Sequence, residues 1–389
     1  MTHLPPNIAQ MVLESIEKNG WEGFPDLMTL LLNQAMKLQR EHHMGAAWHE
    51  RSPHRVDHAN GFKSKTLKTR MGTLNLSVPQ TRNGGFYPSI LERGVRSERA
   101  LMLAVAEMYV SGVSTRKVRK ITEELCGMSI SSTQVSRLTA LMDQELSLWR
   151  QRPLDEIPFL ILDAHYEKVR HDGSVMDLAV LKAVGIRKDG RKTVLGVSVS
   201  LSEAEVHWRA FLESLTARGI KGIRMVISDD HAGLKAARKA ALPGVRWQRC
   251  VFHLMQNAQS HCAKKSMIPK LMSELEKIYT APDKGTALQR LKALVASYAK
   301  TAPDLARWIE ADFIEGLTFF DFPEPFWKKT RTSNLVENLN KQVRKRTNVC
   351  GLFPNADSAL RLISAVLMDL SESWETGKRH FKCMGLLDS

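Results

Sequence analysis

The spacing of apolar residues changes along the chain and separates parts with different predicted structures. In residues 1–45, leucine and methionine recur at helical intervals, which predicts an amphipathic helix. This periodicity then fades, and residues 51–100 carry ten Lys and Arg but only three Asp and Glu. Within that basic segment, TLKTRMGTLNLSVPQTR alternates like a short β-hairpin. The segment is either a solvated surface or an arm that contacts phosphate groups.

Residues 113–142 predict two helices joined by a short, glycine-containing turn. Ser114 or Thr115 can cap the first helix, and Ser131 or Ser132 can cap the second. This order is that of a helix-turn-helix, although any helical hairpin that simply packs against its neighbours has the same pattern. The polar residues expected to contact DNA from this unit are Arg116, Lys117, Gln134 and Arg137.

In the second half of the chain, strands and helices alternate. The run FLILD (159–163) is typical of a buried strand, and Asp189-Gly190 is a hairpin turn between two further strands. The expected elements are strands over 159–163, 178–188 and 192–201, a helix over 204–218 that buries Trp208, Phe211, Leu212 and Leu215, a strand over 223–228, a helix over 231–242 and a strand over 245–252. This order matches the RNase H-like fold. The mostly helical residues 253–325 are expected to interrupt it before a last helix over 332–347.

Three carboxylates are the candidate catalytic and metal-binding residues. Asp163 and Asp229 each end an apolar strand, where loops leave side chains exposed to a ligand. Glu337 is the one acid among seven Lys and Arg in residues 326–350, so it is either a salt-bridge partner or a site residue. Three carboxylates can hold two Mg²⁺ or Mn²⁺ ions about 4 Å apart, and these ions prefer oxygen ligands. Phosphoryl transfer at such a site needs no protein nucleophile.

Composition narrows the class of partner and the compartment. Of 389 residues, 56 are Lys or Arg and 41 are Asp or Glu, which gives a formal net charge of +15. Such a charge favours a polyanionic partner, with nucleic acid the leading candidate and an ordinary basic protein the alternative. The five scattered cysteines form no disulfide framework and indicate a reducing cytosol. No signal peptide is evident, and the longest apolar stretch is too short to span a bilayer, so no membrane partner is expected.

Five stretches of the chain carry a family resemblance: STRKVRKITEELCG, FLILDAHYEKVR, RGIKGIRMVISDDHAGLKAA, WQRCVFHLMQN and RTSNLVENLNKQVRKRT. Together they resemble the Mutator-type transposases of bacterial insertion sequences, which are DDE enzymes with an RNase H-like catalytic core. The resemblance runs from about residue 50 to the C-terminus. It implies that Asp163, Asp229 and Glu337 form the catalytic triad. The family usually has a small residue at the position of Asp230, for which we expect a capping role at the following helix.

The resemblance also implies function and domain organisation. It implies a homodimeric transposase of the bacterial cytoplasm, associated with the nucleoid, that binds double-stranded DNA at terminal inverted repeats and at the target. Cleavage and strand transfer would use Mg²⁺ or Mn²⁺. The alternatives are a transposase-derived DNA-binding regulator without catalysis and an RNase H-like metal-dependent nuclease. The expected domains are a helical DNA-binding region (1–150), the first part of the core (155–252), a helical insertion (253–325) and the completion of the core (326–389).

Basic and aromatic residues near the carboxylates are further candidates for DNA contacts. Arg344 resembles the basic residue that many DDE enzymes place near the transposon end, with a general phosphate contact or a solvated charge as the alternative. Trp247 is either a platform for an unpaired base or a core tryptophan. The other basic residues expected at the DNA are Arg331, Lys341, Lys345 and Arg346.

Histidine and cysteine residues near the acids admit two interpretations. Cys250 and His253, followed by the adjacent His261 and Cys262, suggest zinc, but an adjacent pair is a poor chelate. A buried thiol and a hydrogen-bonded histidine are the alternative. His165 and His231, which lie beside the predicted acids, are expected to bond to phosphate or to orient water rather than to bind Mg²⁺.

Overall fold

The chain forms two compact units, Met1–Leu141 and Met142–Ser389. The computed structural model describes residues 14, 17–47, 50, 52–69, 72–91, 99–110, 113–126, 130–131, 134–135, 139 and 142–387. In this described part of the chain, no helix combines the length and the apolar character that a bilayer crossing requires.

The first unit contains a helix packed on a long hairpin. Its elements are η1 (Gly20–Gly23), α2 (Phe24–Met44), β1 (Ala59–Thr69), β2 (Gly72–Thr81), α3 (Arg99–Val110) and α4 (Thr115–Cys126). Strands β1 and β2 pair antiparallel, and alternation along β2 buries Leu74, Leu76 and Val78 with Met36 of α2. The predicted hairpin is confirmed, and it is longer than the alternating segment alone indicated.

Helix α4 lies where the first helix of the predicted helix-turn-helix was expected. Ser114 caps it, because its Oγ accepts a hydrogen bond of 3.3 Å from the amide of Lys117. Ser131 and Gln134 form a capping box: the Gln134 amide donates to Ser131 Oγ (3.2 Å), and the Ser131 amide donates to Gln134 Oε1 (2.9 Å). Most of the second predicted helix, including Arg137, lies outside the described residues, so a helix-turn-helix is not shown.

The second unit is built on a mixed five-stranded sheet in the order β5-β4-β3-β6-β7. Its strands are β3 (Phe159–His171), β4 (Ser174–Ile186), β5 (Lys192–Ser200), β6 (Met225–Ser228) and β7 (Arg246–Arg249). Strands β3, β4 and β5 are antiparallel neighbours, whereas β6 runs parallel to both β3 and β7. The five predicted strands are therefore confirmed, and their order is consistent with an RNase H-like core.

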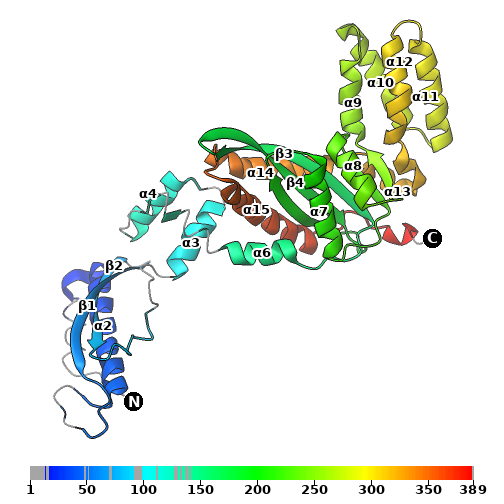
Figure 1. Ribbon diagram of the computed structural model, residues 1–389. Coiled ribbons are helices and arrows are strands. Elements are labelled where there is room, and N and C mark those ends of the chain that lie inside the picture. The colour runs from blue at the N-terminus through cyan, green and yellow to red at the C-terminus, as the bar shows by residue number, and fades with distance from the viewer. Residues whose placement is uncertain are drawn as a thin grey trace. The chain divides into compact units, whose positions relative to one another are not determined.

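Helices cover both faces of this sheet (Figure 1). They are α6 (Asp143–Gln151), α7 (Glu205–Ala217), α8 (Ala232–Ala241), α13 (Glu324–Thr330), α14 (Asn334–Cys350) and α15 (Ala356–Thr376), followed by η6 (Met384–Leu387). Trp208 and Leu212 of α7 pack on Leu160 and Leu162 of β3, as the helical spacing predicted. The intervening positions of β3 face the opposite side, where Phe159 contacts Phe326 with ring centroids 5.4 Å apart. Asp163 belongs to this second set of positions.

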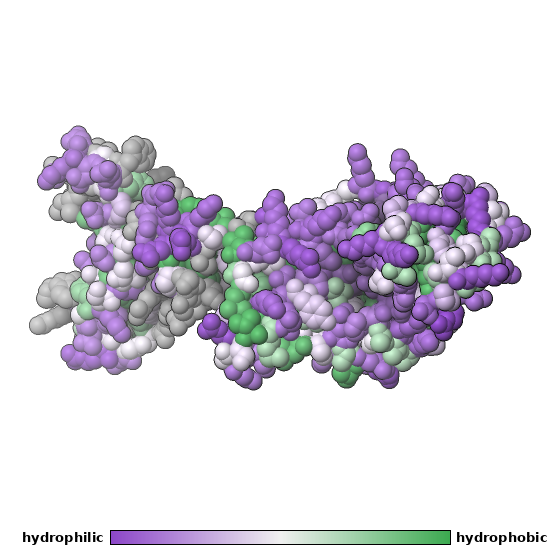
Figure 2. All heavy atoms as spheres, turned by 90° about the horizontal axis from the view of Figure 1, so that it is seen from above, coloured by the Kyte–Doolittle hydropathy of each residue, from purple (hydrophilic) through white to green (hydrophobic). Residues whose placement is uncertain are grey.

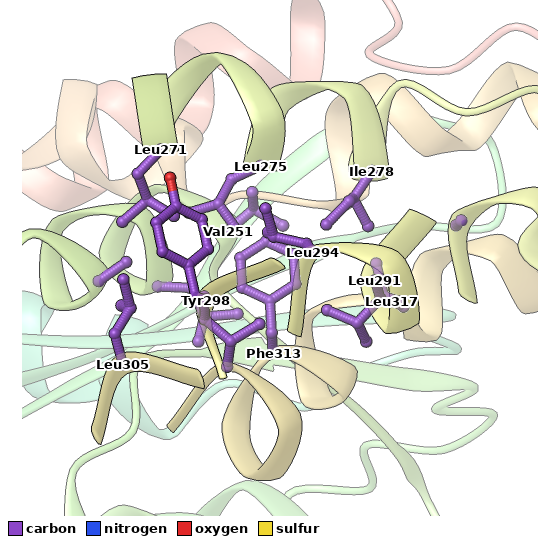
Figure 3. Close-up of a cluster of buried hydrophobic side chains, with 14 of the residues drawn as sticks. Val251, Leu271, Leu275, Ile278, Leu291, Leu294, Tyr298, Leu305, Phe313 and Leu317 are labelled. Atoms are coloured by element: carbon purple, nitrogen blue, oxygen red, sulfur yellow. The ribbon is translucent and has the colours of Figure 1, made fainter. Parts of the chain in front are cut away.

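Residues 253–325 were predicted to be mostly helical, and all the regular elements described there are helices. They enclose an apolar core of their own (Figure 3). Its helices are α9 (Val251–Ser260), η3 (Lys265–Met267), α10 (Ile268–Tyr279), α11 (Lys284–Tyr298), α12 (Pro303–Asp312), η4 (Phe313–Gly316) and η5 (Thr318–Asp321). Leu271, Leu275, Leu305 and Phe313 are all completely buried in this core. Side chains from α9, α10, α11 and α12 and from the short helices η4 and η5 thus pack on one another in a core separate from that of the sheet.

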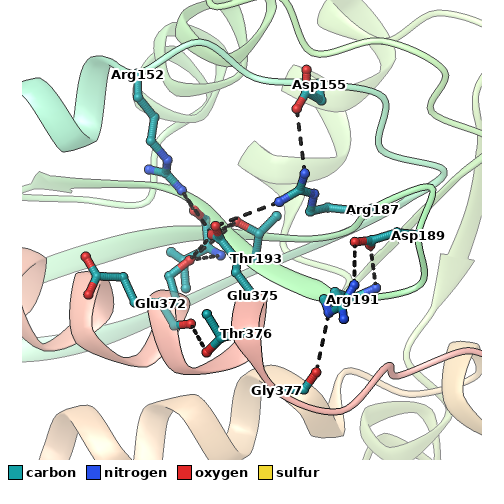
Figure 4. A network of polar contacts seen from close by, with 12 residues as sticks. Arg152, Asp155, Arg187, Asp189, Arg191, Thr193, Glu372, Glu375, Thr376 and Gly377 are labelled. Atoms are coloured by element: carbon teal, nitrogen blue, oxygen red, sulfur yellow. Dashed lines mark hydrogen bonds and ion pairs between the residues drawn. The ribbon is translucent and has the colours of Figure 1, made fainter.

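Polar contacts fasten α15 to β5 at the far end of the sheet (Figure 4). Thr193 Oγ1 donates a hydrogen bond of 2.6 Å to Glu375 Oε1. Arg187 Nη1 lies 3.8 Å from Glu375 Oε2, and Arg152 Nη2 lies 4.0 Å from Oε1.

The visible surface in the space-filling view is mainly hydrophilic, with smaller hydrophobic areas between charged groups (Figure 2). This surface agrees with a chain in which 25% of residues are charged.

Candidate functional site

Asp163 on β3 and Asp229 just beyond β6 fall at corresponding positions when the register of these parallel strands is extended by two residues past their last pair. Phe159 pairs with Met225 and Ile161 with Ile227, and each pair is 66 residues apart, as Asp163 and Asp229 are. Asp229 directly follows the end of β6, as predicted. Asp163 does not end its strand, which corrects the prediction: β3 continues to His171 because β4 pairs with it along its whole length.

Helix α14 brings Glu337 to the same side of the sheet as Asp163. Asn340, one helical turn after Glu337, donates a hydrogen bond of 2.8 Å from Nδ2 to Asp163 Oδ2. Val336, Leu339, Val343 and Thr347 form the buried face of α14. Oε1 of Glu337 is buried and has no hydrogen-bond partner among the described residues.

His253 links Asp229 to Glu337 and Cys250. Its Nδ1 lies 2.5 Å from Asp229 Oδ1, which is an ion pair although the two atoms are poorly aligned for a hydrogen bond. Donor atoms of Cys250, His253 and Glu337 lie within 4.8 Å of one another. Burial opposes the charged imidazolium, but Asp229 and Cys250 together raise the pKa of His253 to about 10. The imidazolium is therefore held against the Asp229 carboxylate.

Cys250 ties the end of β7 to the start of α14. Its buried sulfur accepts hydrogen bonds from the amide (3.3 Å) and the hydroxyl (3.2 Å) of Ser333. Burial alone would raise the pKa of the thiol, yet contacts from His253 and Ser333 hold that pKa below its ordinary value. His261 and Cys262 do not belong to the donor group around Cys250 among the described residues, so the zinc interpretation gains no support from them, and the Cys250 thiol is buried as in the alternative.

Asp230 has a different role from the one expected. His231, not Asp230, is the N-cap residue of α8, so the capping prediction is wrong. Oδ1 of Asp230 lies 3.2 Å from Lys235 Nζ, and Oδ2 lies 3.0 Å from Arg249 Nη1. His231 is half-exposed, with Nε2 3.7 Å from Glu203 Oε2.

The same cations hold two acids of the helical segment. Arg249 Nη1 lies 2.6 Å from Asp312 Oδ1 and 3.3 Å from Glu315 Oε2, and Lys235 Nζ lies 2.9 Å from Glu315 Oε1. We call Asp230, Lys235, Arg249, Asp312 and Glu315 the polar junction. Its three carboxylates are close enough to hold a metal ion, but Arg249 and Lys235 already pair with them and leave one net negative charge.

A buried polar chain lies beneath Asp163, and His165 is its one member that was a predicted site residue. Lys182, completely buried on β4, is the cross-strand partner of Asp163, and its Nζ lies 3.3 Å from Asp163 Oδ2 and 2.7 Å from His165 Nδ1. Nε2 of His165 lies 3.0 Å from Glu167 Oε1, which accepts a hydrogen bond of 2.8 Å from Thr347. Burial lowers the pKa of Lys182 to about 8 against the opposing charge of Asp163. The lone lysine in LAVLKAVGI was the available signal.

The residues predicted to contact DNA differ in whether they are exposed or already engaged within the protein. Arg116 and Lys117 on α4, and Lys341, Arg344 and Lys345 on α14, are exposed, and Arg346 is half-buried. Gln134 is engaged in its capping box, and Arg331 lies over the Tyr279 ring at 4.9 Å from its centroid.

Trp247 is engaged by neighbouring side chains in this structure. Its Nε1 donates a hydrogen bond of 2.9 Å to Ser228 Oγ, and Lys235 and Arg238 lie 4.8 and 4.9 Å from its ring centroid. The ring also packs against the core between α7, α8 and the sheet. These contacts favour the core interpretation over base stacking.

A mixed sheet with carboxylates from two neighbouring strands and a facing helix is consistent with an RNase H-like enzyme core. Comparison with known proteins defines the family: the one described as "Transposase, Mutator family" matches residues 5–377. The chain is 48% identical over 374 residues to the transposase for insertion sequence element IS406 of Burkholderia multivorans, covering 96% of each protein. It is 39% identical to the transposase for ISRM5 of Rhizobium meliloti, over 98% of this chain and 96% of that protein.

The transposase for IS256 in transposon Tn4001 of Staphylococcus aureus is a more distant relative. It is 36% identical, over 96% of this chain and 95% of its own length. The chain belongs to the Mutator family of transposases, and the resemblance of its motifs is confirmed. The matched residues begin at 5, well before the position near 50 where the motif resemblance began.

Proposed function

We propose that this protein is a DDE transposase with an RNase H-like core. It would cleave DNA at the terminal inverted repeats of its insertion sequence and join the freed 3′-hydroxyl to target DNA. The observation that carries the proposal is the shared register of β3 and β6, which gives Asp163 and Asp229 corresponding positions. Asn340 supports it further, because its bond to Asp163 holds the Glu337 helix against the same strand.

Asp163, Asp229 and Glu337 would hold Mg²⁺ or Mn²⁺, as two ions. Their donor atoms are all carboxylate oxygens, which suit these hard cations. Oε1 of Glu337 is buried without a hydrogen-bond partner among the described residues, as expected of an atom that binds a cation, whereas Oδ1 of Asp229 is paired with His253. Bound ions would supply charge stabilisation for phosphoryl transfer. The chain's own contribution is to fix the three carboxylates on a strand, a strand end and a helix.

Exposed cations on α14 would grip the DNA next to these carboxylates. Lys341 and Arg344 follow Glu337 by four and seven residues, so all three share one face of the helix. A guanidinium at Arg344 can contact phosphate on either side of the scissile bond. Arg116 and Lys117 of α4 would contact DNA in the separate N-terminal unit.

The proposed division of labour follows the predicted domains. Residues 1–150 would recognise transposon ends, and residues 155–252 with 326–389 would form the catalytic core. The helical segment 253–325 would shape the site or a homodimer interface, since two transposon ends must be processed together. A DNA substrate places the protein in the bacterial cytoplasm at the nucleoid.

A strand-transfer assay with labelled transposon-end DNA and Mg²⁺ tests the proposal. We expect the wild-type protein to cut and join the ends, and Asp163→Ala, Asp229→Ala and Glu337→Ala each to lose at least about a hundredfold in rate while still binding DNA. Asp177→Ala is the matched control, because Asp177 lies on the same sheet but is exposed and paired with Lys168 at 2.7 Å. This variant should keep wild-type activity.

Three outcomes would contradict the proposal. End binding without cutting by the wild-type protein would indicate a regulator, and cutting without preference for the ends would indicate a general nuclease. Activity retained in Asp229→Ala would show that the carboxylates are assigned wrongly.

A further inference from the structure

Lys182 is an unusual residue for the centre of a sheet. It is the one charged side chain in residues 178–186, and it is completely buried. Burying an ammonium group is costly unless it is paired and hydrogen-bonded, and a methionine of similar length would fill the same space without that cost. The contacts of Lys182 therefore indicate what the charge does there.

Two donors converge on one oxygen of Asp163. Lys182 Nζ lies 3.3 Å from Oδ2, and Asn340 Nδ2 donates a hydrogen bond of 2.8 Å to the same atom. Lys182 also donates to Oδ1 of the Asn340 amide, which fixes the orientation of that amide. Among the described residues, no side chain donates a hydrogen bond to Oδ1 of Asp163, so the two oxygens of this carboxylate differ in their surroundings.

The contacts behind Lys182 keep its position fixed. His165 Nδ1 lies 2.7 Å from Nζ, and the His165 ring is itself held by Glu167 at 3.0 Å. Thr347 of α14 donates to Glu167, so the chain of contacts begins and ends on the helix that carries Glu337. Lys182 thus cannot withdraw from Asp163 without disrupting the packing of α14 on β3.

We propose that Lys182, together with Asn340, occupies Oδ2 of Asp163 so that this carboxylate offers a cation only Oδ1. Lys182 is a positioning residue for the metal ligand Asp163, and it thereby favours Mg²⁺ over Ca²⁺. The chemical reason is that Mg²⁺ requires near-octahedral ligands that each occupy one position, whereas Ca²⁺ accepts bidentate carboxylates. This inference rests on the proposed function, because it takes Asp163 as a metal ligand.

Competition for bound Mn²⁺, followed by electron paramagnetic resonance of the full-length protein without DNA, tests the inference. Mg²⁺ and Ca²⁺ are each titrated against Mn²⁺, and the ratio of their dissociation constants is compared between variants. We expect Lys182→Met to shift this ratio toward Ca²⁺ by about tenfold or more, in the range seen when a partner of a metal ligand is removed. Asn340→Leu should shift it in the same direction, because it frees the same oxygen from the other side.

Two controls separate this inference from simpler causes. Lys188→Met removes an equal charge from an exposed lysine that is 3.4 Å from Glu156, and it should leave the ratio unchanged. Asp163→Ala should weaken binding of both ions and remove the effect of Lys182→Met. Circular dichroism verifies that each variant is folded. If Lys182→Met does not fold, Asn340→Leu tests by itself whether freeing Oδ2 of Asp163 shifts the ratio.

The outcomes distinguish the two levels of inference. An unchanged Mg²⁺ to Ca²⁺ ratio in the folded variants, with binding still dependent on Asp163, overturns the role of Lys182 and leaves the proposed function standing. Wild-type metal binding in Asp163→Ala overturns both, because Asp163 would then not be a ligand.

Discussion

Replacing Arg249 by methionine tests whether the polar junction holds the helical segment to the strand end that carries Asp229. The side chain of Arg249 is 4% exposed, and its Nη1 lies within 3.3 Å of an oxygen of each of Asp230, Asp312 and Glu315. Methionine would leave three carboxylates with Lys235 as their one remaining cation in the polar junction. Asp230 adjoins Asp229 in the chain, so we also expect weaker DNA cleavage.

The expected loss of stability follows from the burial of these groups. Removing one partner of a fully buried ion pair costs about 3–5 kcal/mol, whereas exposed pairs contribute about 0–1 kcal/mol. The carboxylate side chains of the junction are 23–30% exposed, so water partly compensates for the lost guanidinium. We therefore expect a loss of about 2–3 kcal/mol, below the fully buried range.

Hydrogen exchange measures this loss locally, which matters because two compact units need not unfold in one step. Amides of α8 and α12 should exchange about 30- to 150-fold faster in Arg249→Met than in the wild-type protein. Arg209→Met is the control: the Arg209–Glu205 pair is more than 40% exposed on both sides, and its loss should cost less than about 0.5 kcal/mol.

A double-mutant cycle with Glu315→Gln provides the refuting result. If Arg249 neutralises Glu315, the Glu315→Gln change should be costly in the wild-type background and nearly neutral or favourable in the Arg249→Met background, a coupling of about 1 kcal/mol or more. Coupling below about 0.3 kcal/mol, or wild-type protection in Arg249→Met, would show that the junction does not stabilise this region.

Three further predictions concern stability. Leu275→Ala should cost about 2–5 kcal/mol and speed hydrogen exchange mainly within the helical segment, because Leu275 is completely buried in that core; equal effects on the sheet would contradict this independence. Gly190→Ala should lower the melting temperature, since Gly190 has φ +82° and a Cβ there would overlap the Phe381 carbonyl oxygen; an unchanged value would contradict the close approach. Burial and two nearby lysines lower the pKa of His380 to about 4, below its unfolded value of 6.5, so the folded state binds fewer protons. The stability that His380 contributes is complete above pH 6.5 and is lost as pH falls toward 4, by at most about 2 kcal/mol. In His380→Gln, the urea concentration at the unfolding midpoint should therefore depend less on pH between 4 and 6.5 than it does in the wild-type protein.

The elements of the sheet could be predicted because their signals are local. Helical spacing identified the buried face of α7, and Asp189-Gly190 marked the turn between β4 and β5, where Gly190 has a positive φ. Asp229 was recognisable as a strand-end acid for the same reason. The apolar run that ends at Leu162 gave a strand that was too short, because the later residues of β3 are held by pairing with β4 rather than by burial of apolar side chains.

The partners of individual charges depended on the tertiary structure. A local capping rule assigned Asp230 to the start of α8. In the structure its carboxylate instead pairs with Arg249 and with Lys235, and Lys235 also pairs with Glu315, which is distant in sequence. Lys182 and Asn340 are 158 residues apart and meet only because α14 packs on β3. The sequence by itself determined the strands, the helices and the three candidate carboxylates, since backbone geometry and apolar periodicity act over a few residues. Only the tertiary structure decided which cation lies beside each acid, because Coulomb energies depend on distance and burial in space rather than on separation along the chain.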